Sequence, residues 1–292
     1  MSRKLIKSRI TSVKNTRKIT KAMEMVAASK MRKAVSATFR GRPYVVLAKS
    51  TIEAVMERSG SSLKHPMLTP GAGDRELIVL FTSDRGLAGG YNVNMVKFAR
   101  EQMKSLGDVD VVAVGKRGSD AMQRLKYNVV ASFAGLGNAP KYSDIVPVAR
   151  FALDGFLQGK YRRVRLLYTH YVSGVTQTPS MQTVLPYGEQ GAGSRQPAVG
   201  GEGKKRSSDY TIEPNASELL SRVIPNLVMT TFYQALLESS ASEHAARMLA
   251  MKNASDSARD MMESLTFTYN QVRQAAITQE IAEISSGAAA LA

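Results

Sequence analysis

The amino-acid sequence predicts an α/β protein with long helices, in which a doubly wound sheet domain lies between two long terminal helices. Residues 1–40 and 226–286 contain neither Gly nor Pro, while the chain between them alternates short apolar runs with amphipathic stretches. With 292 residues, 43% of them hydrophobic, the chain can fill a sizeable core. Cysteine is absent, which excludes disulfide scaffolds, zinc ribbons and cysteine nucleophiles.

The first segment is both basic and periodic. Residues 1–33 carry eleven Lys or Arg and a single acid, Glu24, and so supply +10 of the formal charge of +16. As a helix, residues 1–40 would be about 60 Å long. We expect Gly41 and Pro43 to end or kink this helix, which resumes through residues 50–58. A step of three or four residues, typical of a coiled-coil seam, links Ile6, Ile10, Val13, Thr16, Ile19, Met23 and Val26.

The last segment has a start signal and the same period. Pro214 precedes two candidate caps, Asn215 and Ser217, and Glu218 falls in the first turn. We expect Pro225 to bend this helix or to begin a new segment. Residues 226–286 would form a rod of about 90 Å, longer than a compact domain, so the apolar stripe needs a cover. The expected seam contains Ala258, Met261, Leu265, Tyr269, Val272 and Ala276.

The central part reads as alternating strands and helices. The expected strands are 76–81, 109–114, 129–133, 163–170 and 181–185, and the expected helices are 94–106, 117–126 and 143–157. Alternation with short links predicts a parallel, doubly wound sheet. Residues 188–208 are rich in Gly, Ser and charge, which predicts a flexible loop.

Two features suggest catalysis only weakly. The loop Thr82–Asn92 follows a strand and contains three glycines, but their spacing fits neither the dinucleotide fingerprint nor a Walker loop. We interpret these glycines as permitting a tight turn and close packing. Ser83, Asp84 and His170 lack the nucleophile elbow of a hydrolase triad, and His170 falls within a strand pattern.

The basic N-terminal segment favours an anionic partner, which is a nucleic acid, an anionic lipid surface or an acidic protein surface. Aromatic residues are absent from residues 1–38, and the same segment carries an apolar seam. A protein partner explains both the charge and the seam, whereas a nucleic acid explains only the charge. No apolar run approaches the roughly 20 residues of a membrane span, and no signal-peptide pattern is present, so we expect a cytosolic chain.

Three segments, Asn15–Lys33, Thr82–Asn92 and Ile277–Leu291, resemble the gamma subunit of bacterial F-type ATP synthases. They cover both ends and the middle of the chain in the same order. The resemblance implies a central Rossmann-like domain flanked by N- and C-terminal helices that form an antiparallel coiled coil. The expected domains are the N-terminal helix 1–58, the α/β domain 74–187, the flexible loop 188–210 and the C-terminal helix 214–288.

The resemblance implies a central-stalk rotor subunit, which transmits rotation of the membrane ring to the catalytic ring and couples proton flow to ATP synthesis or hydrolysis. Such a subunit is not itself an enzyme and needs no cofactor or metal. Its partners are the alpha and beta subunits, the epsilon subunit and the ring of c subunits, with one copy per complex and no nucleic acid. It is peripheral, at the cytoplasmic face of the bacterial inner membrane. The alternative is a nucleotide- or nucleic-acid-binding α/β protein with basic helical arms.

The resemblance also carries partner-contact residues, which are Met23, Arg247, Arg273, Gln274, Thr278, Glu280 and Glu283. Arg273 and Gln274 match positions that contact a loop of one beta subunit. The remaining five, and Gln274 again, match positions implicated in coupling the shaft to the catalytic ring. Met23 also has a plainer interpretation as a seam residue, because Met commonly fills gaps in seams. The loop 188–208 is longer than expected, so no contact with epsilon or the c ring is assigned to a residue.

Overall fold

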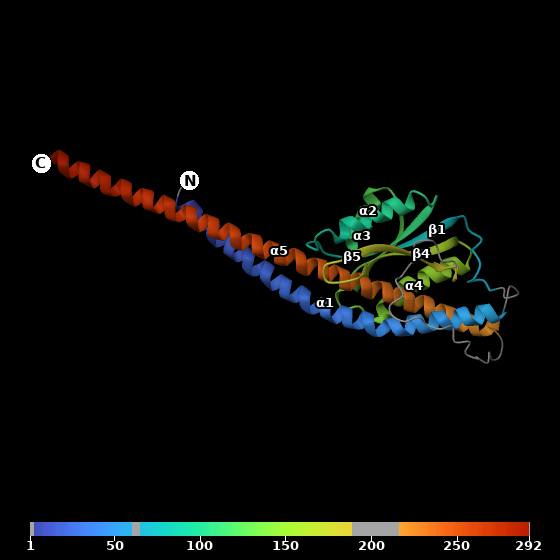
Figure 1. Ribbon diagram of the computed structural model, residues 1–292. Coiled ribbons are helices and arrows are strands. Elements are labelled where there is room, and N and C mark those ends of the chain that lie inside the picture. Colours follow the sequence, from blue (N-terminus) through green and yellow to red (C-terminus); the bar gives the residue numbers. More distant parts are fainter. Residues whose placement is uncertain (1–2, 60–64, 189–215, 292) are drawn as a thin grey trace. The chain divides into compact units, whose positions relative to one another are not determined.

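The structure, a computed structural model, describes residues 3–59, 65–188 and 216–291 (Figure 1). The helices are α1 (Arg3–Ser59), α2 (Tyr91–Met103), α3 (Lys116–Arg124), the short 3-10 helix η2 (Leu136–Asn138), α4 (Tyr142–Leu157) and α5 (Ala216–Leu291). The strands are β1 (Arg75–Phe81), β2 (Val109–Val114), β3 (Asn128–Phe133), β4 (Tyr161–Tyr171) and β5 (Gln177–Leu185). Each expected strand and central helix is confirmed, with ends shifted by a few residues.

The strands form one sheet in the order β3-β2-β1-β4-β5. The first four strands are parallel, as expected, but β5 pairs antiparallel with β4. The expectation of a wholly parallel sheet is therefore wrong for its last strand. Only residues 172–176 separate β4 from β5, too short a connection for a crossover helix, so the two strands form a hairpin.

Both faces of the sheet are buried, and the side chains of each strand alternate between the two faces. On β1, Leu77, Val79 and Phe81 join a core that includes α4, whereas Ile78 and Leu80 join the core beneath α2 and α3. This arrangement explains why β1 reads as a continuous apolar run. Helices therefore cover both faces, as the doubly wound class requires (Figure 1).

Both terminal helices are uninterrupted. Helix α1 passes through Gly41 and Pro43, and α5 passes through Pro225, so neither helix ends at these residues and no new segment begins there. A proline removes one backbone hydrogen bond, and packing of a long amphipathic helix can offset that loss. At Gly41, an added Cβ would lie 2.9 Å from Oε1 of Gln234. Its lack of a side chain therefore lets α5 approach α1.

The chain divides into two compact units whose boundaries fall inside α1 and α5. We call residues 1–27 with residues 247–292 the helical unit, and residues 28–246 the sheet unit. The expected flexible loop 188–210, apart from Gly188, and the expected cap residue Asn215 lie outside the described residues.

Within the sheet unit, α1 and α5 run antiparallel. Ile52 of α1 shares the core of the α4 face with Ile224 of α5, whereas Ala34 clusters with Ala241. Later residues of α1 therefore lie with earlier residues of α5. The two helices join the same apolar core as α4, so helix pair and sheet are packed as one body in this unit.

Candidate functional site

The seam of the helical unit follows a strict heptad. From Ile6, steps of four and three residues reach positions that are at least half-buried, and they continue as Ile10, Val13, Arg17, Thr20, Glu24 and Ala27. The expected seam residues Thr16, Ile19 and Val26 are exposed instead. On α5 the expected seam is confirmed at Ala258, Leu265, Tyr269, Val272 and Ala276, which are at least half-buried. It is wrong only at Met261, which is exposed while Met262 is half-buried.

Helix geometry, rather than hydrophobicity, decides which positions of α1 the heptad turns inward. Between Val13 and Ala27 the apolar residues do not coincide with those positions. Polar Arg17, Thr20 and Glu24 therefore occupy the seam. Ile19 and Val26, seven residues apart on one outer face, are left exposed.

The C-terminal end of α5 is exposed all round. Helix α5 continues past the N-terminal end of α1 within the helical unit (Figure 1), and every residue from 277 to 286 is exposed. Ile277, Ile281 and Ile284 lie on one face at steps of four and three residues. We call these three side chains the tip stripe. A contiguous exposed apolar stripe of this kind marks a surface that a partner covers.

All seven expected contact residues lie in the helical unit. Arg273, Gln274, Thr278, Glu280 and Glu283 are exposed and stand together in the last turns of α5. Arg273 and Glu280, seven residues apart, share the face of the tip stripe. Within α5, Nε2 of Gln279 donates a hydrogen bond to Oε1 of Glu283 over 2.9 Å.

Met23 and Arg247 differ from the other five because both are half-buried. Met23 lies directly beside the seam position Glu24, in keeping with its plainer interpretation as a packing residue. The two residues stand outside the exposed end of α5, so the seven do not form one site.

The sheet unit has the strand order of nucleotide-binding sheets, which bind ligands beyond the carboxyl ends of β1 and β4. A cavity beyond the carboxyl ends of β1 and β2 has a volume of about 10 Å³, room for one water molecule at most. Leu236, Ser239, Ser240 and Glu243 of α5 line it, and Oγ of Ser240 donates to the carbonyl of Gly137 over 2.9 Å.

The loop Thr82–Asn92 uses its polar groups for internal packing. Oγ1 of Thr82 accepts a hydrogen bond from the Gly118 amide over 2.8 Å, and Asp84 accepts the amides of Lys116 and Gly135. These contacts hold the ends of neighbouring strands together. Gly89 has a positive φ of 54°, in keeping with the tight turn that the glycines of this loop were expected to permit.

The weak hydrolase triad is dispersed. Oγ of Ser83 donates to the carbonyl of Arg85 over 2.6 Å, whereas Asp84 binds the backbone amides described above. His170 pairs with Glu238 on α5. The three side chains therefore have separate partners and do not share a site.

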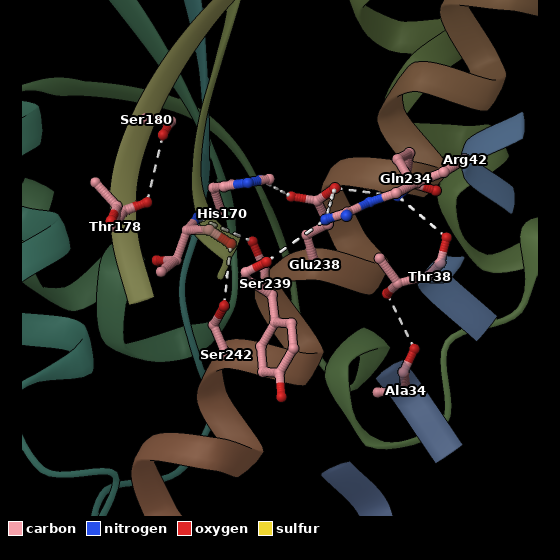
Figure 2. A network of polar contacts seen from close by, with 12 residues as sticks. Ala34, Thr38, Arg42, His170, Thr178, Ser180, Gln234, Glu238, Ser239 and Ser242 are labelled. Atoms are coloured by element: carbon pink, nitrogen blue, oxygen red, sulfur yellow. Dashed lines mark hydrogen bonds and ion pairs between the residues drawn. The ribbon is translucent and has the colours of Figure 1, made fainter. Parts of the chain in front are cut away.

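Sequence reasoning missed a buried polar cluster centred on Glu238, whose side chain is 3% exposed (Figure 2). His170 of β4 donates from Nδ1 to Oε2 over 2.5 Å. Arg42 of α1 and Gln234 of α5 donate to Oε1 over 3.4 and 3.1 Å. We call these four residues the Glu238 cluster. The only sequence signal is a Glu within a run of small and apolar residues.

The cluster keeps Glu238 ionised. Burial alone would raise the pKa of its carboxyl group, because a charge is poorly solvated there. The hydrogen bond and charge of His170, the hydrogen bond from Gln234 and the charge of Arg42 outweigh burial and hold the pKa below the ordinary value. Glu238 is thus a buried anion fully supplied with partners.

Within the described ranges 3–59, 65–188 and 216–291, His, Asp and Glu side chains nowhere gather in the groups of three or more that a metal ion would need. None of the helices in these ranges is long and apolar enough to span a membrane.

The similarity to known proteins extends over almost the whole chain. The model of the family described as ATP synthase matches residues 2–291. The ATP synthase gamma chain of Roseiflexus castenholzii is 40% identical over 296 residues, which cover 98% of this chain and 97% of that one. The ATP synthase gamma chain of Xanthomonas campestris pv. campestris is 41% identical over 295 residues and 98% of both chains.

Solved structures agree with the fold. A chain from the central stalk and c ring of the Tetrahymena thermophila mitochondrial ATP synthase is 25% identical with a TM-score of 0.58, covering 81% of this chain and 99% of that chain. A chain of the Euglena gracilis mitochondrial ATP synthase in rotational state 3 has a TM-score of 0.67 at 19% identity, covering 99% and 94%. The chain therefore belongs to the gamma-chain family of ATP synthase.

Proposed function

We propose that this chain is the central-stalk rotor of an ATP synthase and transmits rotation of a membrane ring to the catalytic ring. The observation that carries the proposal is the pair of uninterrupted helices, of 57 and 76 residues, in a chain that matches gamma chains over 98% of its length. A shaft must be stiff, and paired helices provide stiffness. The exposed end of α5 then needs a surrounding partner.

The tip stripe supports a specific role for that end. An apolar stripe on a lone helix suits a sleeve lined by apolar side chains, and shallow contacts let the helix turn inside it. The alpha and beta subunits form the sleeve, and Arg273 and Gln274 contact one beta subunit. The other five expected residues, Met23, Arg247, Thr278, Glu280 and Glu283, act in coupling. The epsilon subunit and the c ring bind elsewhere on the chain.

The subunit makes and breaks no bond itself. The small cavity beyond the carboxyl ends of β1 and β2, lined in part by α5, supports this part of the proposal because it has no room for a nucleotide. It also weighs against the alternative of a nucleotide-binding α/β protein. Work is done by the asymmetric shaft, which forces the beta subunits through different nucleotide affinities. We place the complex at the cytoplasmic face of the membrane.

The experiment is reconstitution with alpha and beta subunits. The full chain should be recovered at one copy per three alpha–beta pairs and should raise the rate of ATP hydrolysis by the ring. A chain with Arg273→Ala and Gln274→Ala should bind more weakly, whereas the exposed substitution Arg124→Ala in the sheet unit should not matter. Failure of the unmodified chain to join the ring would refute the proposal.

A further inference from the structure

The Glu238 cluster joins three elements of the sheet unit that are far apart in the sequence. Arg42 belongs to α1, His170 to the carboxyl end of β4, and Glu238 with Gln234 to α5 (Figure 2). Nε2 of Gln234 also donates to the carbonyl of Thr38 over 3.5 Å, and Nη2 of Arg42 to the carbonyl of Tyr171 over 3.5 Å. Each helix is therefore bound to the other and to the sheet through a single carboxylate.

Two serines next to the cluster attach α5 to the β4 backbone. The register of β4 with β1 ends at Leu167, so the residues that follow have no partner in β1. There the Thr169 amide donates to Oγ of Ser239 over 3.4 Å, and Oγ of Ser242 donates to the Thr169 carbonyl over 3.2 Å (Figure 2). Helix α5 thus takes the place of a strand at the end of β4.

Apolar packing and hydrogen-bonded charge hold helices in different ways. Apolar contacts are non-directional, so they specify the register of two helices less strictly than directional hydrogen bonds do. A buried carboxylate has few acceptor positions, and shifting one helix would leave a charge without its partner. In coiled coils, single buried polar residues fix register in this way.

We propose that the Glu238 cluster is the joint that fixes α1, α5 and β4 in one register, so that torque passes between the sheet and the helix pair without slip. The inference rests on the proposed function, because a torque is transmitted only in a rotor. Both helices continue from this unit into the helical unit. Glu238 is a positioning residue: it touches neither nucleotide nor catalytic ring, and acts through the helices that it binds.

A second buried carboxylate in the same unit provides a matched control. Glu76, with a side chain 8% exposed, is bound by Arg163 and Arg165 at 3.4 and 2.9 Å. Both arginines lie on β4 and Glu76 lies on β1, so these ion pairs link two strands of one sheet and involve no helix. Removing its charge should destabilise the unit in a similar way without loosening the helices.

The test uses inverted membrane vesicles that carry the assembled complex, with ATP hydrolysis and proton pumping measured together. For Glu238→Gln we expect the number of protons pumped per ATP to fall at least about threefold while ATP hydrolysis persists. For Glu76→Gln we expect the ratio to stay at the wild-type value. Coupled pumping by the wild-type complex is the separate test of the proposed function, so failure there and failure here are distinguishable.

Three results decide the inference. Wild-type coupling in Glu238→Gln overturns it, and so does an equal loss of coupling in both variants, since that loss would reflect general destabilisation. If Glu238→Gln does not assemble, the triple variant Arg42→Met, His170→Phe and Glu238→Leu replaces the cluster with apolar side chains that can preserve stability. That variant should assemble and hydrolyse ATP with poor coupling, and normal coupling in it overturns the inference.

Discussion

The tip stripe yields a prediction whose size follows from the structure. Ile277, Ile281 and Ile284 keep 45, 62 and 72% of their surface exposed. Fully burying one Ile stabilises by about 1.5–3 kcal/mol, so covering the exposed parts of all three is worth about 3–5 kcal/mol. Substituting all three by Ser should remove most of this gain when the chain binds the alpha–beta ring.

The same substitution should leave the free chain almost unchanged. Because these side chains are exposed there, and because Ser and Ile have similar helix propensities, the free energy of unfolding should change by less than about 1 kcal/mol. Binding to the ring, by contrast, should weaken by about two to three orders of magnitude, since each 1.4 kcal/mol is a factor of ten. The two measurements together separate an interface effect from a folding effect.

The assays are urea unfolding of the full chain and titration of the chain into a purified alpha–beta ring. Val175→Ser is the control, because Val175 is 74% exposed and lies in the β4–β5 connection of the sheet unit. It should change neither measurement. Unchanged ring affinity of the triple Ser variant would show that the tip stripe has no apolar sleeve, and would refute the reasoning.

Three further predictions concern stability and charge. Gly115→Ala should lower the free energy of unfolding in urea by at least about 2 kcal/mol, because Gly115 has a φ of +102° and an added Cβ would lie 2.2 Å from the Thr82 carbonyl oxygen. The control Gly107→Ala is also at positive φ but has open space around it, and it should lower that free energy by only about 1 kcal/mol. The pKa of Glu238 is lowered in the folded chain, so its contribution to stability is complete above the ordinary Glu value of 4.5 and is lost as the pH falls from that value toward the lowered pKa. The free energy of unfolding should therefore depend less steeply on pH in this range for Glu238→Gln than for the unmodified chain. An equal slope would contradict the pKa argument. Binding of the basic end of α1 to the ring should weaken with added salt. Neutralising Lys4, Lys7 and Arg9 should reduce this salt dependence of the affinity. A salt-independent affinity would exclude electrostatic attraction.

Much of the fold was predictable because it depends on local patterns. The apolar run of β1 and the alternation of strands with helices placed the sheet, and the absence of helix breakers placed the long helices. Pro43 and Pro225 misled the prediction, since tertiary packing along a long helix outweighs one missing hydrogen bond. The antiparallel β5 depends on the length of a connection rather than on any residue.

The candidate sites were predictable only in part. The expected contact residues at the end of α5 are exposed together there, but the seam of α1 was assigned by hydrophobicity, whereas the heptad turns polar Arg17 and Glu24 inward. The Glu238 cluster was missed because its partners Arg42 and His170 lie 196 and 68 residues away in the sequence, and only the fold brings them together. Pairwise contacts of this kind leave no periodic signal in one sequence.

The central claim, that this chain turns within a catalytic ring, is tested most directly by observing rotation. The chain contains no Cys, so Val175→Cys gives one labelling site on an exposed side chain of the sheet unit. With the alpha–beta ring fixed to a surface and a bead attached at this site, ATP should drive stepwise rotation of the bead in one direction. A bead that stays still while the labelled complex hydrolyses ATP would contradict the account.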